Sequence, residues 1–195
     1  MEKTRLSESA SASLISKPSS VNGMTMRGVY VAQCFDKDGR LKWEDTFDNH
    51  VATVGMDLFL DSTLDGSAYT TVGPFMGLIS SVSWSTTAVG DTMASHAGWT
   101  EAGASNVPDY SGDRKTCVWT SSTGGVLALS AALVFTFTSG GTVKGCFIVS
   151  GSGAVNTHDS TAGTLISSGV FTGGDKVVAN TDVLNVSYSL TLADT

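Results

Sequence analysis

The side chains that could do chemistry are densest in the segment Asp91–Glu101, which reads DTMASHAGWTE. Ser95, His96 and a carboxylate from Asp91 or Glu101 are the residue types of a hydrolase. A serine nucleophile, however, needs a base within hydrogen-bond reach and a strained, exposed turn. The Gly-x-Ser-x-Gly pattern of such a turn does not occur in the chain. The sequence therefore favours a structural role, with Asp91 as the cap of one helical turn at 92–97.

Other chemical patterns are equally weak. Glycoside cleavage needs paired carboxylates, and the candidates Glu101, Asp109, Asp113 and Asp175 stand in segments typical of turns. His50, His96 and His158 are isolated, and no Cys or His pair has the spacing of metal ligands. The Asp36–Glu44 segment has too few ligands for a calcium loop and predicts an Asp-Gly turn. We expect no catalytic, metal or cofactor site.

Composition excludes further classes. Only 15% of the residues are charged, and the net charge is −7, which argues against nucleic-acid binding because phosphates are neutralised by Lys and Arg. No apolar run is long enough to cross a membrane. Cys34, Cys117 and Cys146 stand in apolar segments, so we expect free, buried thiols in a protein made in a reducing cytosol.

Residues 1–27 differ from the rest of the chain. They are rich in serine and carry +2, which leaves −9 for residues 28–195. The segment is either a disordered tail or an arm that becomes ordered against a neighbouring subunit. In the second case its basic residues are the expected contacts: Lys3, Arg5, Lys17 and Arg27.

The body, residues 28–195, has the pattern of an all-β protein. Residues 29–47 predict a hairpin, and residues from about 50 to 64 predict one short helix that Asn49 caps. Eight or nine strands are expected in total, with alternating apolar residues that are clearest from Leu184 to Leu192. The fold class is a two-sheet antiparallel sandwich, possibly a jelly roll, with an extended N-terminal arm. The strands expected beyond the helix are 75–84, 116–119, 127–138, 143–149, 165–171, 176–179 and 184–192.

Several stretches resemble virion proteins of tailed bacteriophages: Pro74–Gly103, Tyr110–Thr116, Val143–Val155 and Gly163–Leu192. In size and strand content the chain is similar to capsid cement, or decoration, proteins of short-tailed phages. The resemblance implies a non-enzymatic protein on the capsid exterior, made in the bacterial cytoplasm. It also implies the major capsid protein and further copies of the chain, as a dimer or trimer, as partners, without nucleic acid or membrane.

Two alternatives stay open. The chain could be a tail, tail-fibre or head-fibre component that contacts a partner or a host glycan through loop aromatics such as Trp119. The loop residues proposed for contact are His96, Trp99, Glu101, Tyr110 and Arg114. A small glycan-processing enzyme is the least favoured class, and Glu101 and Asp175 would be its carboxylates.

Overall fold

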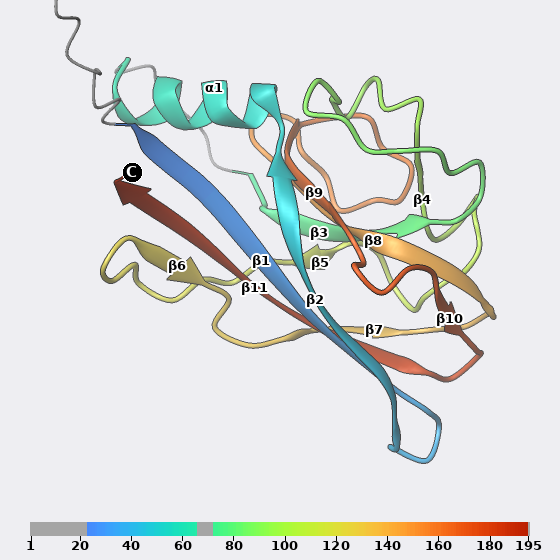
Figure 1. Ribbon diagram of the computed structural model, residues 1–195. Helices are drawn as coiled ribbons and strands as arrows, with labels where there is room; N and C mark the ends of the chain where they lie inside the picture. Colours follow the sequence, from blue (N-terminus) through green and yellow to red (C-terminus); the bar gives the residue numbers. More distant parts are fainter. Residues whose placement is uncertain (1–22, 66–71, 195) are drawn as a thin grey trace, which may run out of the picture.

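A computed structural model describes residues 23–65 and 72–194. These residues form eleven antiparallel strands and one helix, so the predicted all-β sandwich with a short helix is confirmed (Figure 1). The predicted arm residues Lys3, Arg5 and Lys17 lie outside the described residues. The elements are β1 (Met24–Phe35), β2 (Leu41–Val51), α1 (Thr53–Thr63), β3 (Phe75–Ser80), β4 (Thr100–Glu101), β5 (Lys115–Thr116), β6 (Val126–Ala128), β7 (Leu133–Thr136), β8 (Gly141–Ser150), β9 (Thr164–Val170), β10 (Lys176–Val178) and β11 (Val183–Asp194).

The strand β2 joins the two layers of the sandwich. Its first part pairs with β1, from Leu41 opposite Phe35 to Asp48 opposite Val29. Its last three residues, 49–51, pair instead with β9. The hydrogen-bonded order is β4-β3-β8-β9-β2-β1-β11-β6, with β7 also on β11, β5 also on β3 and β10 also on β8. We call β1, β2, β6, β7 and β11 the first sheet, and β3, β4, β5, β8, β9 and β10 the second.

The main core lies between the sheets and follows the two-residue period of the strands. Tyr30 and Cys34 of β1 and Leu184 of β11 face Leu78 of β3 and Ile148 of β8. The alternation predicted for β11 is confirmed at its first four apolar positions. It fails at Leu192, which is 37% exposed because the second sheet does not cover the end of β11.

The second sheet is buried on both faces. In β8, Cys146 and Ile148 belong to the main core, whereas the alternate residues Phe147 and Val149 face outward. These outward residues form a smaller apolar cluster with Trp99. The segments 81–99 and 151–163, which contain no helix, carry part of this cluster and cover the outer face. The long loops are therefore part of the folded core rather than surface appendages.

The helix begins later than predicted. Asn49 is not its cap, because Asn49 lies in β2; there its amide accepts the Gly28 N–H at 2.7 Å and donates to the Tyr188 hydroxyl at 3.0 Å. The N-cap is Ala52, which makes no side-chain cap. Gly55, which the sequence suggests would weaken the helix, is its buried residue: a Cβ there would lie 2.6 Å from the Ile166 carbonyl oxygen of β9. Close packing of α1 on β9 therefore requires this glycine.

Other boundaries also differ from the predictions. β1 begins at Met24, so Arg27 lies in a strand, where it forms an ion pair with Asp48. The expected strand 127–138 is interrupted between β6 and β7, and the expected strand 75–84 ends at Ser80. Residues 92–95 form a tight turn closed by reciprocal backbone hydrogen bonds, not the predicted helical turn. Within the described ranges, no helix is long and apolar enough to cross a membrane.

Candidate functional site

The structure brings the predicted loop residues together, but inside the protein. Trp99, Glu101, Tyr110 and Arg114 are all at most 5% exposed. Only His96 among the five is partly exposed. The prediction that all five contact a partner from the surface of a loop is therefore not compatible with the positions of these four side chains. Arg114 in particular has its charged group inside the protein and not at a loop surface.

Glu101 and Arg114 form a buried two-point ion pair that we call the polar joint. Arg114 Nε donates to Glu101 Oε1 at 2.8 Å, and a terminal nitrogen donates to Oε2 at 2.6 Å. The remaining donors of Arg114 bind the carbonyls of Val155 at 3.2 Å and Ser160 at 2.8 Å. The Asp159 N–H donates to Glu101 Oε2 at 2.9 Å. The joint thus fastens segment 151–163 to β4, and its charges are paired and hydrogen-bonded, as buried charges must be.

A second set of contacts stabilises segment 81–99. Asp91 Oδ2 accepts hydrogen bonds from the Trp99 indole N–H at 2.9 Å and from the Ala88 N–H at 2.8 Å. The imidazole of His96 stacks on Trp99, with 3.9 Å between ring centroids. Its Nδ1 lies 2.9 Å from the Trp99 carbonyl oxygen. Asp91, His96 and Trp99 therefore stabilise one another, and the described residues contain no hydrogen bond between Ser95 and His96.

Tyr110 lies at the other side of the joint. Its ring is perpendicular to Phe135, and His158 approaches it edge-on at 4.7 Å between centroids. Burial raises the pKa of the Tyr110 hydroxyl well above its usual value, and the Glu101 carboxylate adds to this increase. The Lys115 ammonium stands 5.3 Å over the Tyr110 ring, and burial lowers its pKa.

The two charged groups of the polar joint already bind each other, whereas the Tyr110 hydroxyl and the His158 Nε2 are buried without a hydrogen-bond partner among the described residues. A hollow of about 160 Å³ lies beside the joint. Of its three charged lining residues, Glu101 and Arg114 bind each other, and Asp159 donates its backbone N–H to Glu101. His96 is turned toward the Trp99 backbone. Asp175, the second carboxylate of the glycan-enzyme hypothesis, is on another loop, where it pairs with Lys144. The structure does not bring Glu101 and Asp175 together as a catalytic pair.

Metal and thiol chemistry have no evident place in the described part of the chain. No three His, Cys, Asp or Glu residues among 23–65 and 72–194 approach one another closely enough to hold a metal ion. The three cysteines are free and buried, as predicted. Burial raises the pKa of Cys34 and of Cys117 to about 12, so these thiols stay protonated near neutral pH.

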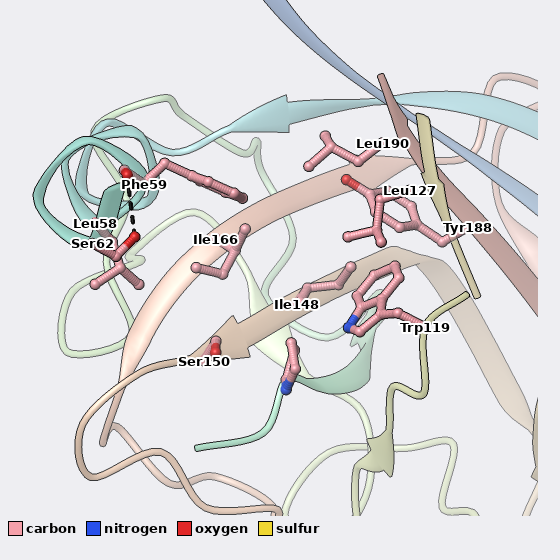
Figure 2. A pocket seen from close by; sticks show the side chains of 11 residues that line it. Leu58, Phe59, Ser62, Trp119, Leu127, Ile148, Ser150, Ile166, Tyr188 and Leu190 are labelled. Atoms are coloured by element: carbon pink, nitrogen blue, oxygen red, sulfur yellow. Dashed lines mark hydrogen bonds between the residues drawn. The ribbon is translucent and has the colours of Figure 1, made fainter. Parts of the chain in front are cut away.

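A second candidate for binding is a different feature, which we call the apolar pocket (Figure 2). It lies between α1, the ends of β8 and β9, and the edge of the first sheet formed by β6 and β11, and its volume is about 170 Å³. Trp119 and Tyr188 line one side and Phe59 of α1 the other (Figure 2). The lining residues are Leu58, Phe59, Ser62, Pro74, Trp119, Leu127, Ile148, Ser150, Ile166, Tyr188 and Leu190.

Few polar groups reach this pocket. The Tyr188 hydroxyl accepts a hydrogen bond from Asn49, and burial raises the pKa of Tyr188 to about 12. Exposed apolar residues follow or precede its lining residues in the chain: Leu60 beside Phe59, Val118 beside Trp119 and Val126 beside Leu127. A concave apolar surface is typical of a binding site for another apolar group.

One member of this pocket, Trp119, was predicted from the sequence as a contact aromatic. Phe59 and Ile166 were not predicted from the sequence. Gly55 could have indicated them, because a glycine inside a helical pattern can mark close contact of the helix with another backbone. Which strands line the pocket depends on the switch of β2 between sheets, and no local pattern encodes that switch.

Comparison of the chain with models of protein families, with curated proteins and with solved structures finds no match.

Proposed function

We propose that this protein is a non-enzymatic structural subunit of a tailed-phage virion, and that it cements the capsid by bridging major capsid subunits. The observation that carries the non-enzymatic part is the polar joint. The densest group of potentially catalytic side chains is used to fasten loops to the second sheet, with each charge bonded internally. The assignment to a virion is supported by the sequence resemblance described above.

The segment before Gly23 suits such a role. It contains three basic residues, Lys3, Arg5 and Lys17, against the acidic residues Glu2 and Glu8. Twenty-two extended residues span on the order of 70 Å, at about 3.3 Å each. A protein that bridges neighbouring subunits with such an arm adds many modest contacts over a whole shell, which together resist expansion or rupture.

The test is a binding assay on empty capsids. The full chain and a variant lacking residues 1–22 are mixed with capsids, and bound protein is measured by co-sedimentation. We expect the full chain to saturate regular sites and the truncated variant to lose most of this binding. The deletion stops before Met24 because β1 begins there. Circular dichroism of the truncated variant controls for folding.

Two results would contradict the proposal. Normal capsid binding by the truncated variant would remove the arm from the mechanism. Immunogold labelling confined to the tail would replace the capsid assignment with the tail or fibre alternative. Of the aromatic residues suggested for that alternative, Trp99 and Tyr110 are buried and Trp119 lines the apolar pocket.

A further inference from the structure

The apolar pocket has features that select its occupant. Its volume of about 170 Å³ is close to that of protein cavities that accept one benzene ring. One branched aliphatic side chain therefore fits. Leaving this surface to water is unfavourable, and the cost grows with the apolar area that an occupant could cover.

The row of α1 next to the lining residues is acidic. Asp57 and Asp61 are exposed, one helical turn apart, and form the row of the helix beside that of the lining residues Leu58 and Ser62. The helix contains no Lys or Arg, and neither carboxylate forms an ion pair with the described residues. Like charges at this spacing repel each other, and Asp61 also stands near the negative end of the helix dipole. A cation beside these residues would relieve both effects.

We propose that the pocket binds this chain's own N-terminal segment, with the Ile15 side chain in the pocket and the Lys17 ammonium beside Asp57 and Asp61. Leu14-Ile15 is the only pair of adjacent large aliphatic residues before Gly23, and Lys17 follows it closely. Pro18 disfavours a helical conformation at Lys17. In an extended segment, residues two apart point to the same side, so Ile15 and Lys17 can meet the pocket and the acidic row together.

The length of the connection permits this placement. In the β1–β11 register, Gly28 is opposite Leu190, which lines the pocket. The described chain begins at Gly23, five residues earlier, or about 17 Å along the strand at 3.4 Å per residue. The eight residues from Ile15 to Gly23 reach up to about 26 Å, enough to turn back and arrive at Leu190. A tether this short gives an effective concentration in the millimolar range, so in dilute solution the segment of the same molecule outcompetes a second copy.

Methyl NMR on the full-length protein tests the proposal directly. The chain has four isoleucines, Ile15, Ile79, Ile148 and Ile166, so a sample labelled at the isoleucine δ1 methyls gives four signals. The Ile15 signal is assigned by its loss in Ile15→Val. We expect it to be shifted upfield by ring currents and to show cross-relaxation to the ring protons of Trp119 or Tyr188. These features should not change between 20 µM and 500 µM protein, on the order of a 25-fold range that is well below the effective concentration.

Variants test the charged part of the interaction, between Lys17 and the two aspartates, separately from the apolar part. Asp57→Asn/Asp61→Asn should move the Ile15 methyl toward the position of an unstructured chain, whereas Asp48→Asn on β2 should leave it unchanged. Leu6→Ser, elsewhere in the same segment, should also have no effect. An Ile15 methyl at its unstructured position without ring contacts overturns the proposal, and so does a shift that appears only at high concentration. The result does not depend on the capsid function.

Discussion

The polar joint and the apolar pocket lie at two places that the two sheets alone do not cover. The first is closed by polar contacts, whereas the second keeps an apolar gap. At the joint, loops cover the outer face of the second sheet, and a buried ion pair with three backbone partners fastens them. At the pocket, α1 closes against β9 through Gly55, and the gap that remains is apolar and open. The paired charges of the joint are bonded within the protein, whereas an unfilled apolar gap retains binding capacity. The region of the polar joint contains the most residues of catalytic types, yet the joint holds loops in place. The apolar pocket contains almost none and is the better candidate for binding.

The largest expected effect comes from breaking the joint. Arg114→Met leaves the Glu101 carboxylate buried without its cation, so we expect the free energy of unfolding to fall by about 3–5 kcal/mol. Urea denaturation followed by tryptophan fluorescence measures this change. Arg27→Met is the matched control, because the Arg27–Asp48 pair is exposed on both sides and should contribute less than about 1 kcal/mol. Equal losses in the two variants would contradict the structural role of the joint.

A double substitution sharpens this result. Glu101→Leu/Arg114→Met removes both charges and should recover part of the loss, since no unpaired charge remains. Recovery should be incomplete because the Val155 and Ser160 carbonyls and the Asp159 N–H lose their partners as well. Full recovery would mean that the loss in Arg114→Met is only the cost of an unpaired buried charge, and that the attachment to segment 151–163 adds little stability.

The second prediction concerns the closure of the pocket. Gly55→Ala favours an isolated helix by about 0.8–1 kcal/mol, yet its Cβ would lie 2.6 Å from a backbone oxygen of β9. Overpacking of this kind costs about 1–3 kcal/mol, so we expect net destabilisation and faster hydrogen exchange in α1. Gly90→Ala, where a Cβ meets nothing within 4 Å, is the control and should be close to neutral. A stabilised Gly55→Ala variant would show that α1 does not pack closely on β9.

The third prediction is that the apolar pocket and the polar joint affect the pH dependence of stability differently. Burial raises the pKa of Tyr188, beside the pocket, to about 12, above its ordinary 10.0. A raised folded-state pKa adds stability that is complete below the unfolded pKa and is lost as the pH rises through the folded value. We therefore expect stability to fall between about pH 10 and pH 12. Tyr188→Phe should flatten that decline in a series of urea titrations, while Arg114→Met should lower stability at every pH without changing its slope there.

Features of the fold and of the candidate sites could be predicted where they depend on residues close together in the sequence, and not where they depend on residues far apart. The hairpin, the β11 alternation and the buried cysteines depend on neighbouring residues, and the sequence predicts them well. Asn49 was misassigned because its amide bonds Gly28 and Tyr188, residues remote in the chain. Arg114 was predicted as a loop contact because its partner Glu101 approaches it only after segment 102–113 has folded back. The apolar pocket is lined by six separate stretches of the chain, 58–62, 74, 119–127, 148–150, 166 and 188–190, so single-sequence patterns could not define it.

The smallest effect is expected at acidic pH, from the contact between β2 and the loop before β10. Asp45 accepts hydrogen bonds from Lys176 at 2.8 Å and from the Gly173 N–H at 3.0 Å. Burial alone would raise the pKa of Asp45, but these contacts lower it below 3.8. A lowered pKa adds stability above the unfolded value that is lost as the pH falls through the folded one.

Asp45→Asn should therefore reduce stability at pH 7 by about 1 kcal/mol and flatten its decline below pH 4. Equilibrium unfolding from pH 2.5 to 7 measures both quantities. If the variant instead keeps the acid dependence of the parent protein, the acid sensitivity belongs to other carboxylates, and the Asp45 contact resembles the exposed Arg27–Asp48 pair more than the polar joint.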